Sequence, residues 1–245
     1  MNLPPVASPD DPVRWTLITA RGADARSFLQ GQLSADVRSV SPDHCRSSLL
    51  LSPGGEVITS LECRGVPGDV DAIDVVVREE MAEVAASALR RFLMRTRCEL
   101  TVAGQVDGPY ATLGEQVDAG EPGPNEFAQA LSAHSFGRSF VSRRVSFTKG
   151  CFTGQELVGR LDARDAPVPF RLARVSGHDI ARMNDVVTSA GPKGERARQG
   201  LTTVVGERRL RGLAVVHRTL GMGTTLLDAT DVSIELLHEP SDADN

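Results

Sequence analysis

Residues 149–158 of this 245-residue chain read KGCFTGQELV, and their spacing is the most informative feature of the sequence. Thr153 and Glu156 have the T-x-x-E spacing of a capping box, which predicts that a helix begins at Thr153. Cys151 then precedes the helix by two residues, near the positive end of the helix dipole and beside Lys149. Both the helix dipole and the positive charge of Lys149 favour the thiolate over the thiol. The stretch therefore predicts a reactive cysteine, Cys151, assisted by Lys149.

The glycines of this stretch predict a close approach of a ligand to the backbone. Gly150 and Gly154 have no side chain that would hinder contact with backbone N–H groups. A purely structural interpretation is the alternative: the glycines form a turn, Gln155 satisfies backbone groups, Glu156 caps the helix, and the single cysteine is a small apolar residue. The coincidence of a lysine, a cysteine, two glycines and a helix start favours a functional site.

The residues that lead into this stretch carry no acidic side chain. The chain has 32 acidic residues in 245, yet residues 127–155 contain no Asp or Glu. The segment holds four cations and five of the eight phenylalanines: Arg138, Arg143, Arg144, Lys149, Phe127, Phe136, Phe140, Phe147 and Phe152. A solvated basic face on a partly buried helix is the simpler interpretation. Aromatic faces together with arginine forks predict a site for a flat aromatic anion, such as a folate or a nucleotide.

Lysine is rare in this chain. Of the 27 basic residues only Lys149 and Lys193 are lysines, and the others are arginines. A compact ammonium makes contacts that a planar guanidinium does not, so we interpret Lys149 as selected for more than its charge. We expect Lys149→Arg to impair function with little change in melting temperature.

Composition excludes several classes of protein. Hydrophobic residues make up 40% and charged residues 24%, as in ordinary globular proteins. The net charge of −5 argues against direct nucleic-acid binding. The N-terminus has no signal-peptide pattern and no apolar run approaches the length of a membrane span, so we expect a cytoplasmic protein without membrane contact.

The four cysteines at 45, 63, 98 and 151 lack the spacing of a metal site, and none is predicted. Cys45, Cys63 and Cys98 fall in predicted strands and are expected to be shielded. Cys151 is therefore expected to be the most reactive thiol, in a reducing compartment where free thiols persist.

The first hundred residues alternate between strand and helix patterns. The predicted strands are 14–20, 45–51, 56–64, 71–77 and 98–103, and the predicted helices are 24–33 and 79–94. Ser52-Pro53-Gly54-Gly55 predicts the turn of a hairpin. This alternation is typical of an α+β fold with helices on one face of a sheet.

The second half of the chain has a different pattern. Residues 104–125 are rich in Gly, Pro and acidic residues, which predicts a loop or linker. Short apolar strands follow at 170–175, 200–205, 210–217 and 232–237, a pattern typical of a small β-barrel. We therefore predict an α+β region over 1–165, with possible subdomains 1–104 and 126–165, and a C-terminal β-barrel over 166–245.

Residues 149–156, KGCFTGQE, resemble the K-G-C-[FY]-x-G-Q-E signature of the YgfZ family, folate-binding relatives of the glycine-cleavage T-protein (GcvT). Residues 24–37, DARSFLQGQLSADV, resemble the family's D-A-x-x-F-L-Q-G-Q-L-T-x-D-V. Residues 49–61 and 212–223 resemble its hairpin and the start of its C-terminal barrel. The resemblance covers most of the chain and is tight only around Cys151.

This resemblance implies a GcvT-like folate-binding body followed by a β-barrel. It implies tetrahydrofolate or a derivative, in polyglutamylated form, as the cofactor. The residues expected around it are Arg143, Arg144, Phe147, Gly150, Phe152, Gly154, Gln155 and Glu156. The implied role is support of iron–sulfur cluster assembly or repair and, through cluster-dependent enzymes, of tRNA modification. The implied partners are iron–sulfur assembly or client proteins.

The chain departs from the family pattern in three ways, one of which is a shorter stretch between residues 130–134 and the KGC signature. Aminomethyltransferases carry D-D-L after the hairpin, whereas this chain has Thr59-Ser60-Leu61. A hydroxyl does not replace a carboxylate as proton acceptor near neutral pH, so glycine-cleavage chemistry is not expected. The family's R-x-E-A-G motif falls near residues 130–134, where the Arg and the Glu are absent.

Three alternatives to the folate-binding factor remain open at this point. One is a folate-dependent aminomethyltransferase-like enzyme that handles one-carbon units. Another is a thiol enzyme that uses Cys151 with one of the five histidines: His44, His134, His178, His217 or His238. The last is a protein-binding module whose folate site has decayed.

Overall fold

A computed structural model of the chain describes residues 3–164, 166–189, 198–221 and 231–237. Its contacts divide the chain into two compact units. Unit 1 comprises Met1–Val13, Tyr110–Phe140 and Asp165–Asn245, and unit 2 comprises Arg14–Pro109 and Val141–Arg164. Each unit therefore joins segments that are distant in sequence. The sequence pattern predicts a division of the chain into domains at residue 165. That division stays a prediction.

Unit 2 contains a five-stranded antiparallel sheet with the strand order β3-β4-β5-β2-β6. Its strands are β2 Trp15–Arg21, β3 Arg46–Leu51, β4 Val57–Val66, β5 Asp69–Arg78 and β6 Glu99–Val106. The predicted strands of this region, and the hairpin of β3 and β4, are confirmed. Buried and half-buried residues alternate along most of β4 because successive side chains point to opposite faces of the sheet.

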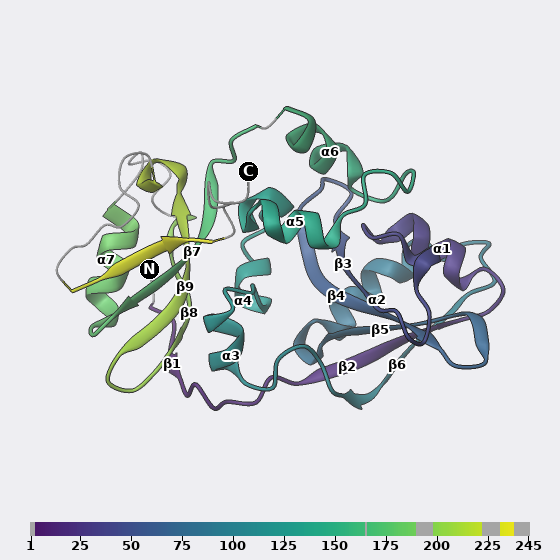
Figure 1. The fold of residues 1–245 in the computed structure, drawn as a ribbon, viewed down its shortest axis with the longest axis horizontal. Coiled ribbons are helices and arrows are strands. Elements are labelled where there is room, and N and C mark those ends of the chain that lie inside the picture. Colours follow the sequence, from purple (N-terminus) through teal and green to yellow (C-terminus); the bar gives the residue numbers. More distant parts are fainter. Residues whose placement is uncertain (1–2, 165, 190–197, 222–230, 238–245) are drawn as a thin grey trace. The chain divides into compact units, whose positions relative to one another are not determined.

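Two helices pack against this sheet, α1 Ala25–Gln32 and α2 Ala82–Arg90 (Figure 1). Leu29 of α1 and Leu89 of α2 share a buried core with Ile18, Cys63 and Ile73 of the strands. The predicted helix over 79–94 is shorter in the structure, because a 3-10 turn (η2 Glu79–Met81) precedes α2 and the helix ends at Arg90. A second 3-10 turn, η1 Val37–Ser39, follows α1. Two further helices, α5 Arg138–Arg144 and α6 Gln155–Arg164, flank the KGCFTGQE stretch.

Unit 1 contains a second five-stranded sheet with the order β1-β8-β9-β7-β10. Its strands are β1 Val6–Ala7, β7 Phe170–Gly177, β8 Gly200–Val205, β9 Leu210–His217 and β10 Ser233–Leu236. The four strands predicted after residue 166 are confirmed. Among the described residues β1 and β10 form the two edges of the sheet and no pairing joins them, so the predicted closed barrel is not confirmed.

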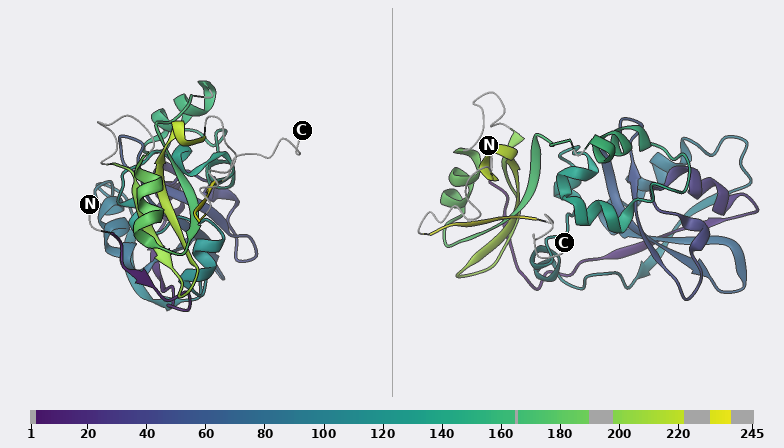
Figure 2. Two further views of the ribbon diagram at one scale, coloured as in Figure 1. Left: turned by 90° about the vertical axis from the view of Figure 1, so that its left-hand side faces the viewer. Right: turned by 45° about the horizontal axis from the view of Figure 1, so that its top comes forward.

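The helices of unit 1 include segments that the sequence did not predict. α7 Ile180–Ser189 lies against the sheet in the left view of Figure 2. Its buried residues Met183, Val186 and Val187 share a core with residues of the strands. The predicted loop over 104–125 contains α3 Leu113–Asp118, and α4 Pro124–Phe127 begins at its end. α3 begins at a capping box in which the Thr112 hydroxyl accepts from the Glu115 backbone N–H. Two 3-10 turns, η3 Ala133–Phe136 and η5 Arg218–Gly221, complete the unit.

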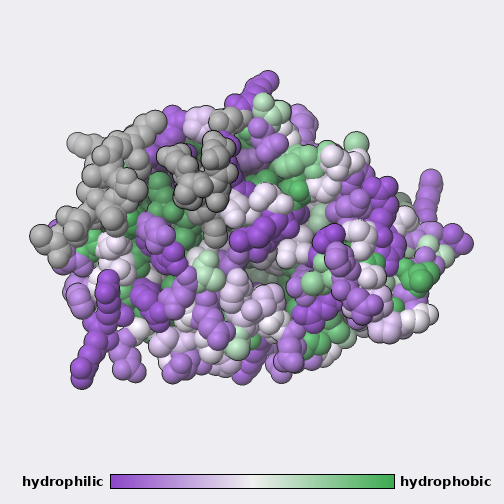
Figure 3. Space-filling view, in the orientation of Figure 1, coloured by the Kyte–Doolittle hydropathy of each residue, from purple (hydrophilic) through white to green (hydrophobic). Residues whose placement is uncertain are grey.

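The longest helices of the described segments, α6 and α7, have ten residues each. Within those segments no helix combines the length and the apolar character that crossing a membrane requires. The face of the molecule in Figure 3 is largely hydrophilic, with apolar residues in small patches.

Candidate functional site

The residues of the KGC loop, defined here as 146–154, are held against the segment that follows α1. The Ser146 backbone N–H donates to the Ser34 carbonyl at 2.9 Å, and the Thr153 N–H donates to the Gly31 carbonyl at 3.0 Å. The Thr153 hydroxyl donates to Gln32 Oε1 at 3.0 Å. The loop is therefore fixed at both of its ends by residues that lie more than a hundred positions earlier in the chain.

Lys149 forms the third attachment of the KGC loop. Its side chain is buried, and Nζ donates to the carbonyl oxygens of Leu33 at 2.5 Å and Ala35 at 2.8 Å. Nζ also lies 5.2 Å from the ring centroid of Phe152, within the range of a cation–π contact. Burial lowers the pKa of Lys149 to about 8, and the negative charge of Asp36 partly offsets this effect. Lys149 thus anchors the loop through its ammonium.

A close backbone contact joins the KGC loop to the turn between β3 and β4. Gly154 has a φ of 78°, and a Cβ atom there would lie 2.5 Å from the Ser52 carbonyl oxygen. On the other side of the contact Gly55 has a φ of 92°, and its Cβ would lie 2.5 Å from Leu157 Cβ. Both positions require glycine for conformation and for space. Gly154 is therefore explained by packing, without a ligand.

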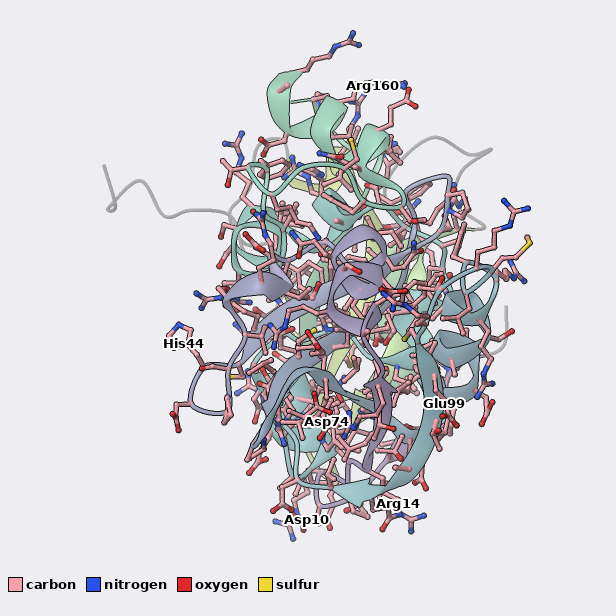
Figure 4. The ribbon with its side chains drawn as sticks, turned by 90° about the vertical axis from the view of Figure 1, so that its right-hand side faces the viewer. Asp10, Arg14, His44, Asp74, Glu99 and Arg160 are labelled. Atoms are coloured by element: carbon pink, nitrogen blue, oxygen red, sulfur yellow. The ribbon has the colours of Figure 1, made fainter. Side chains whose placement is uncertain are left out.

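The predicted capping box is wrong. The helix α6 begins at Gln155 instead of Thr153, and the Thr153 hydroxyl is used by Gln32. The Gln155 side chain accepts from the Phe152 backbone N–H at 3.3 Å. Glu156 forms an ion pair with Arg160, which lies one turn later on α6 (Figure 4). The Thr153 backbone N–H, which a capping box would pair with the Glu156 side chain, donates instead to the carbonyl of the distant residue Gly31.

Two neighbouring residues of the loop remain accessible. Gly150 and Cys151 are both exposed. Gly150 has a φ of 98°, and a Cβ atom built there would meet no atom within 4 Å. Its backbone is therefore open to a ligand, in contrast to that of Gly154. Phe147, on the same loop, is 41% exposed.

The acid-free segment divides into a buried part and an accessible part. The rings of Phe127 and Phe136 lie 5.7 Å apart, and those of Phe136 and Phe140 lie 5.1 Å apart, all three buried. These three rings therefore belong to the buried core. The Phe152 ring is also buried, and it contacts the Lys149 ammonium. Phe147 is the one exposed ring of the five in this segment.

The two arginines expected around a polyglutamylated folate, Arg143 and Arg144, lie in the last turn of α5. Arg143 is exposed and Arg144 is half-buried. The Arg144 carbonyl oxygen accepts from the Ser34 hydroxyl at 2.7 Å, which ties the end of α5 to the same segment that holds the KGC loop. Cations at a helix C-terminus are also favoured by the helix dipole, which is a structural reason for their presence.

The cysteines differ in accessibility from what the strand pattern predicted. Cys63 is fully buried in β4, and burial raises the pKa of its thiol to about 12. Cys98 is partly buried. The prediction that Cys45 is shielded is wrong, because β3 begins one residue later and Cys45 is exposed next to the turn of Ser41 and His44.

We expect limiting iodoacetamide to label Cys151 and Cys45 in the folded protein and to leave Cys63 unmodified, because the Cys63 thiol is both inaccessible and uncharged at neutral pH. Peptide mass spectrometry after short reaction times gives the order, and protein unfolded in urea is the control in which all sites react. Of the two exposed sites, Cys151 is expected to react first. Faster labelling of Cys45 would contradict the special reactivity predicted for Cys151.

For two of the histidines the ring contacts involve no cysteine. The rings of His178 and His217 bond to the Arg208 carbonyl and the Thr219 hydroxyl, respectively, and both lie in unit 1. His44 lies in unit 2 but sits in the exposed turn before β3, at the edge of the view in Figure 4. His238 is outside the described residues. The thiol-enzyme alternative therefore gains no support from these contacts.

Thr59 and Ser60, which stand where aminomethyltransferases carry two aspartates, lie in the middle of β4. Thr59 is buried and its hydroxyl donates to the Ser60 carbonyl at 3.0 Å, while Ser60 is half-buried on the other face of the strand. Ser60 pairs with Leu49 of β3. Neither side chain can act as a carboxylate base, which argues against an aminomethyltransferase-like reaction.

Comparisons with known proteins support the sequence resemblance. No protein-family profile matches the chain. It is similar to the "tRNA-modifying protein YgfZ" of Yersinia pestis (strain Pestoides F) and of Yersinia pseudotuberculosis (serotype O:1b, strain IP 31758). Identity is 26% for both, over an alignment that covers 66% of this chain and 71% of the relative.

Among solved structures the fold is similar to the glycine cleavage system aminomethyltransferase T of Bartonella henselae, with a TM-score of 0.60. The similar region covers 94% of this chain and 86% of the aminomethyltransferase. Sequence identity is 11%, so this comparison describes the fold and not the activity.

Proposed function

Since its sequence relatives and its fold support a YgfZ/GcvT-like family for this chain, we propose that it binds a reduced folate and thereby takes part in tRNA modification. The relatives described as tRNA-modifying proteins favour the cellular role. The resemblance of residues 149–156 to a folate-binding signature favours the ligand. In this proposal the ligand is polyglutamylated tetrahydrofolate, the partners are iron–sulfur assembly or client proteins, and the setting is the reducing cytoplasm.

One observation carries the proposal: the KGC loop is hydrogen-bonded to the segment after α1, while Gly150 and Cys151 stay exposed. Three attachments fix the loop, and one of them places a buried ammonium under it. A loop with that much internal support and an open glycine backbone is organised for contact with another molecule. The exposed Phe147 adds an aromatic surface on the same loop.

The residues present fit a folate in its general chemistry. The open backbone at Gly150 offers hydrogen bonds, Phe147 offers a ring face, and Arg143 with Arg144 offers cations for the carboxylates of a glutamate tail. Cys151 is the nucleophilic or redox-active group of the proposed site. A bound tetrahydrofolate would supply one-carbon or redox chemistry there.

The remaining predicted site residues are assigned a supporting role. Lys149 and Phe152 are buried and stabilise the loop by the cation–π contact and the two carbonyl bonds. Gly154 permits the packing on the β3–β4 turn, and Gln155 and Glu156 begin α6. We therefore propose that Lys149 positions Cys151 and does not itself react.

Folate binding is tested by titrating the protein with monoglutamyl and with polyglutamyl tetrahydrofolate. The double variant Arg143→Glu/Arg144→Glu is expected to weaken binding of the polyglutamate by about tenfold or more and of the monoglutamate by much less, because only the longer tail supplies extra carboxylates. Isothermal titration calorimetry measures both affinities. Arg91→Glu/Arg95→Glu makes the same change of charge at two exposed positions elsewhere in unit 2 and is the control. Equal losses for both ligands would mean that the arginines do not meet the tail.

The role in tRNA modification is tested in a bacterial strain whose own YgfZ gene is deleted. Cys151→Ser is expected to lose at least about tenfold in the level of the modified tRNA nucleosides that cluster-dependent enzymes produce, measured by mass spectrometry. The protein level is expected to stay unchanged, because an exposed thiol contributes little to packing. Cys45→Ser, at the other exposed cysteine, is the matched control and is expected to keep the wild-type level. Full activity of Cys151→Ser would remove the thiol from the proposal.

A further inference from the structure

The sheet of unit 1 carries a polar pocket on the face opposite α7. Ala173 and Val175 of β7 point into the core with Met183 of α7, so Arg174 and Ser176 point to the other face by strand alternation. The register then sets two rows of neighbours across β9, β7 and β10. One row contains Arg211, Ser176 and Ser233, and the next contains Leu213, Arg174 and Glu235.

Part of this face is covered and part is open. α3 and α4 contact β8 and β9, and Leu213 is fully buried. The part of this face that remains open has a pocket of about 290 Å³. It is lined by Arg174, Val175, Ser176, Arg209, Arg211, Ser233 and Glu235. Arg209 directly precedes β9 and continues the alternation of Arg211, so its side chain belongs to the same face.

Two of the three arginines are held in place by acidic or carbonyl groups. Arg174 donates to both carboxylate oxygens of Glu235 at 3.0–3.2 Å and also to the Asp118 carbonyl at the end of α3. Arg211 forms an ion pair with the Asp118 carboxylate. These bonds fix two guanidinium groups at the border of the pocket without use of the two serine hydroxyls.

The third arginine, Arg209, is paired differently. Its guanidinium donates to the Ser176 hydroxyl at 3.4 Å, and within the described segments no carboxylate lies in ion-pair distance of it. Together with Arg174 and Arg211 it makes three positive charges against the two carboxylates of Asp118 and Glu235. The pocket therefore has an excess of one positive charge, located at Arg209 beside a hydroxyl group.

We propose that this pocket binds a small phosphate monoester, with its phosphate between Arg209, Arg211 and the hydroxyls of Ser176 and Ser233. A tetrahedral phosphate has enough oxygens to accept from two guanidinium forks and from two hydroxyl groups at once, whereas one carboxylate does not. The pocket has about ten times the liquid volume of a water molecule. It therefore has room for a three- to five-carbon body attached to the phosphate.

This site is independent of the folate proposal, since all of its lining residues belong to unit 1 and the KGC loop belongs to unit 2. A failure of folate binding would leave it unaffected. Binding of glycerol 3-phosphate, with inorganic phosphate and glycerol as further probes, is measured by isothermal titration calorimetry at low salt. Glycerol 3-phosphate is expected to bind saturably, inorganic phosphate more weakly, and glycerol not at all.

Two variants make the test specific. Arg209→Gln is expected to weaken glycerol 3-phosphate binding by about tenfold or more, because it removes the excess charge and a charge-assisted bond. Arg208 is a neighbouring exposed arginine that does not line the pocket, and Arg208→Gln is expected to bind within about twofold of the wild type. Thermal melting of both variants checks that they are folded.

The proposal is overturned by either of two results. One is the absence of saturable binding of glycerol 3-phosphate up to roughly 10 mM, a concentration at which even a weak site is occupied. The other is an equal loss in Arg209→Gln and Arg208→Gln, which would indicate attraction by the overall surface charge. Ser176→Ala gives a further check, with an expected loss smaller than that of Arg209→Gln because a neutral hydrogen bond contributes less.

Discussion

Gly154→Ala is expected to lower the free energy of unfolding by about 2–5 kcal/mol. A left-handed conformation costs a non-glycine residue about 1–2 kcal/mol, and overpacking adds about 1–3 kcal/mol. At Gly154 both costs apply, because its φ is 78° and a Cβ would lie 2.5 Å from the Ser52 carbonyl oxygen and 2.8 Å from Leu51 Cβ. Urea unfolding followed by circular dichroism measures the difference.

Two other glycines of the same region separate the causes. Gly150 also has a positive φ, of 98°, but its Cβ would meet nothing within 4 Å, so Gly150→Ala is expected to cost about 1–2 kcal/mol. Gly159 lies inside α6, again with open space around its Cβ, and Gly159→Ala is expected to stabilise the protein by about 0.5–1 kcal/mol. If Gly154→Ala lowers the free energy of unfolding by no more than Gly150→Ala does, the β3–β4 turn accommodates the added methyl group without a further loss of stability.

Lys149→Ala is expected to lower the free energy of unfolding by about 2–4 kcal/mol at pH 7. The variant leaves a cavity under the loop, and it removes the donors of two carbonyl oxygens, those of Leu33 and Ala35. Lys149→Arg is expected to be destabilised as well, because a guanidinium is larger than the space of a side chain that is 7% exposed. The burial of Lys149 therefore leads us to expect a lower melting temperature for this variant, in place of the nearly unchanged one expected from the sequence.

The pH dependence gives a signature of the buried ammonium. Because burial lowers the pKa of Lys149 from 10.5 to about 8, the folded state binds its proton less tightly than the unfolded state does. The unfolded state then holds more protons between pH 8 and 10.5, so the contribution of Lys149 to stability rises over this range, by up to about 3 kcal/mol. The neutral amine keeps two N–H donors for the two carbonyls.

The difference in stability between the wild type and Lys149→Ala is therefore expected to widen from pH 8 to pH 10, as measured by urea unfolding. Lys193→Ala, which removes the other lysine of the chain, controls for the loss of one ammonium. A difference that stays constant or narrows with pH would mean that Lys149 is not desolvated in the folded protein.

Local patterns in the sequence were sufficient for nine of the ten described strands and for one hairpin, whereas the two-residue strand β1 was not predicted. The Ser52-Pro53-Gly54-Gly55 turn predicts that β3 and β4 pair as a hairpin. The apolar runs of β5, β7, β8 and β9 predict strands without further information. The helix α3 was missed because it is short and lies in a segment rich in Gly, Pro and acidic residues. Its one local signal was the Thr112–Glu115 capping box, the same kind of signal that misled at Thr153.

The sequence by itself identified the KGCFTGQE stretch as the likeness to a folate-binding family, because the signature is local and contiguous. Only the tertiary structure decided which residues of that stretch are buried and anchor the loop, and which are exposed. Lys149 and Phe152 are buried, and Gly150 and Cys151 are exposed, because the loop is bonded to residues 31–35, more than a hundred positions away. The phosphate pocket follows the same rule, since strand register alone brings Ser176, Arg211 and Ser233 side by side. Spacing along the chain reports local geometry, whereas the partner of a side chain across a sheet or a loop depends on the whole fold.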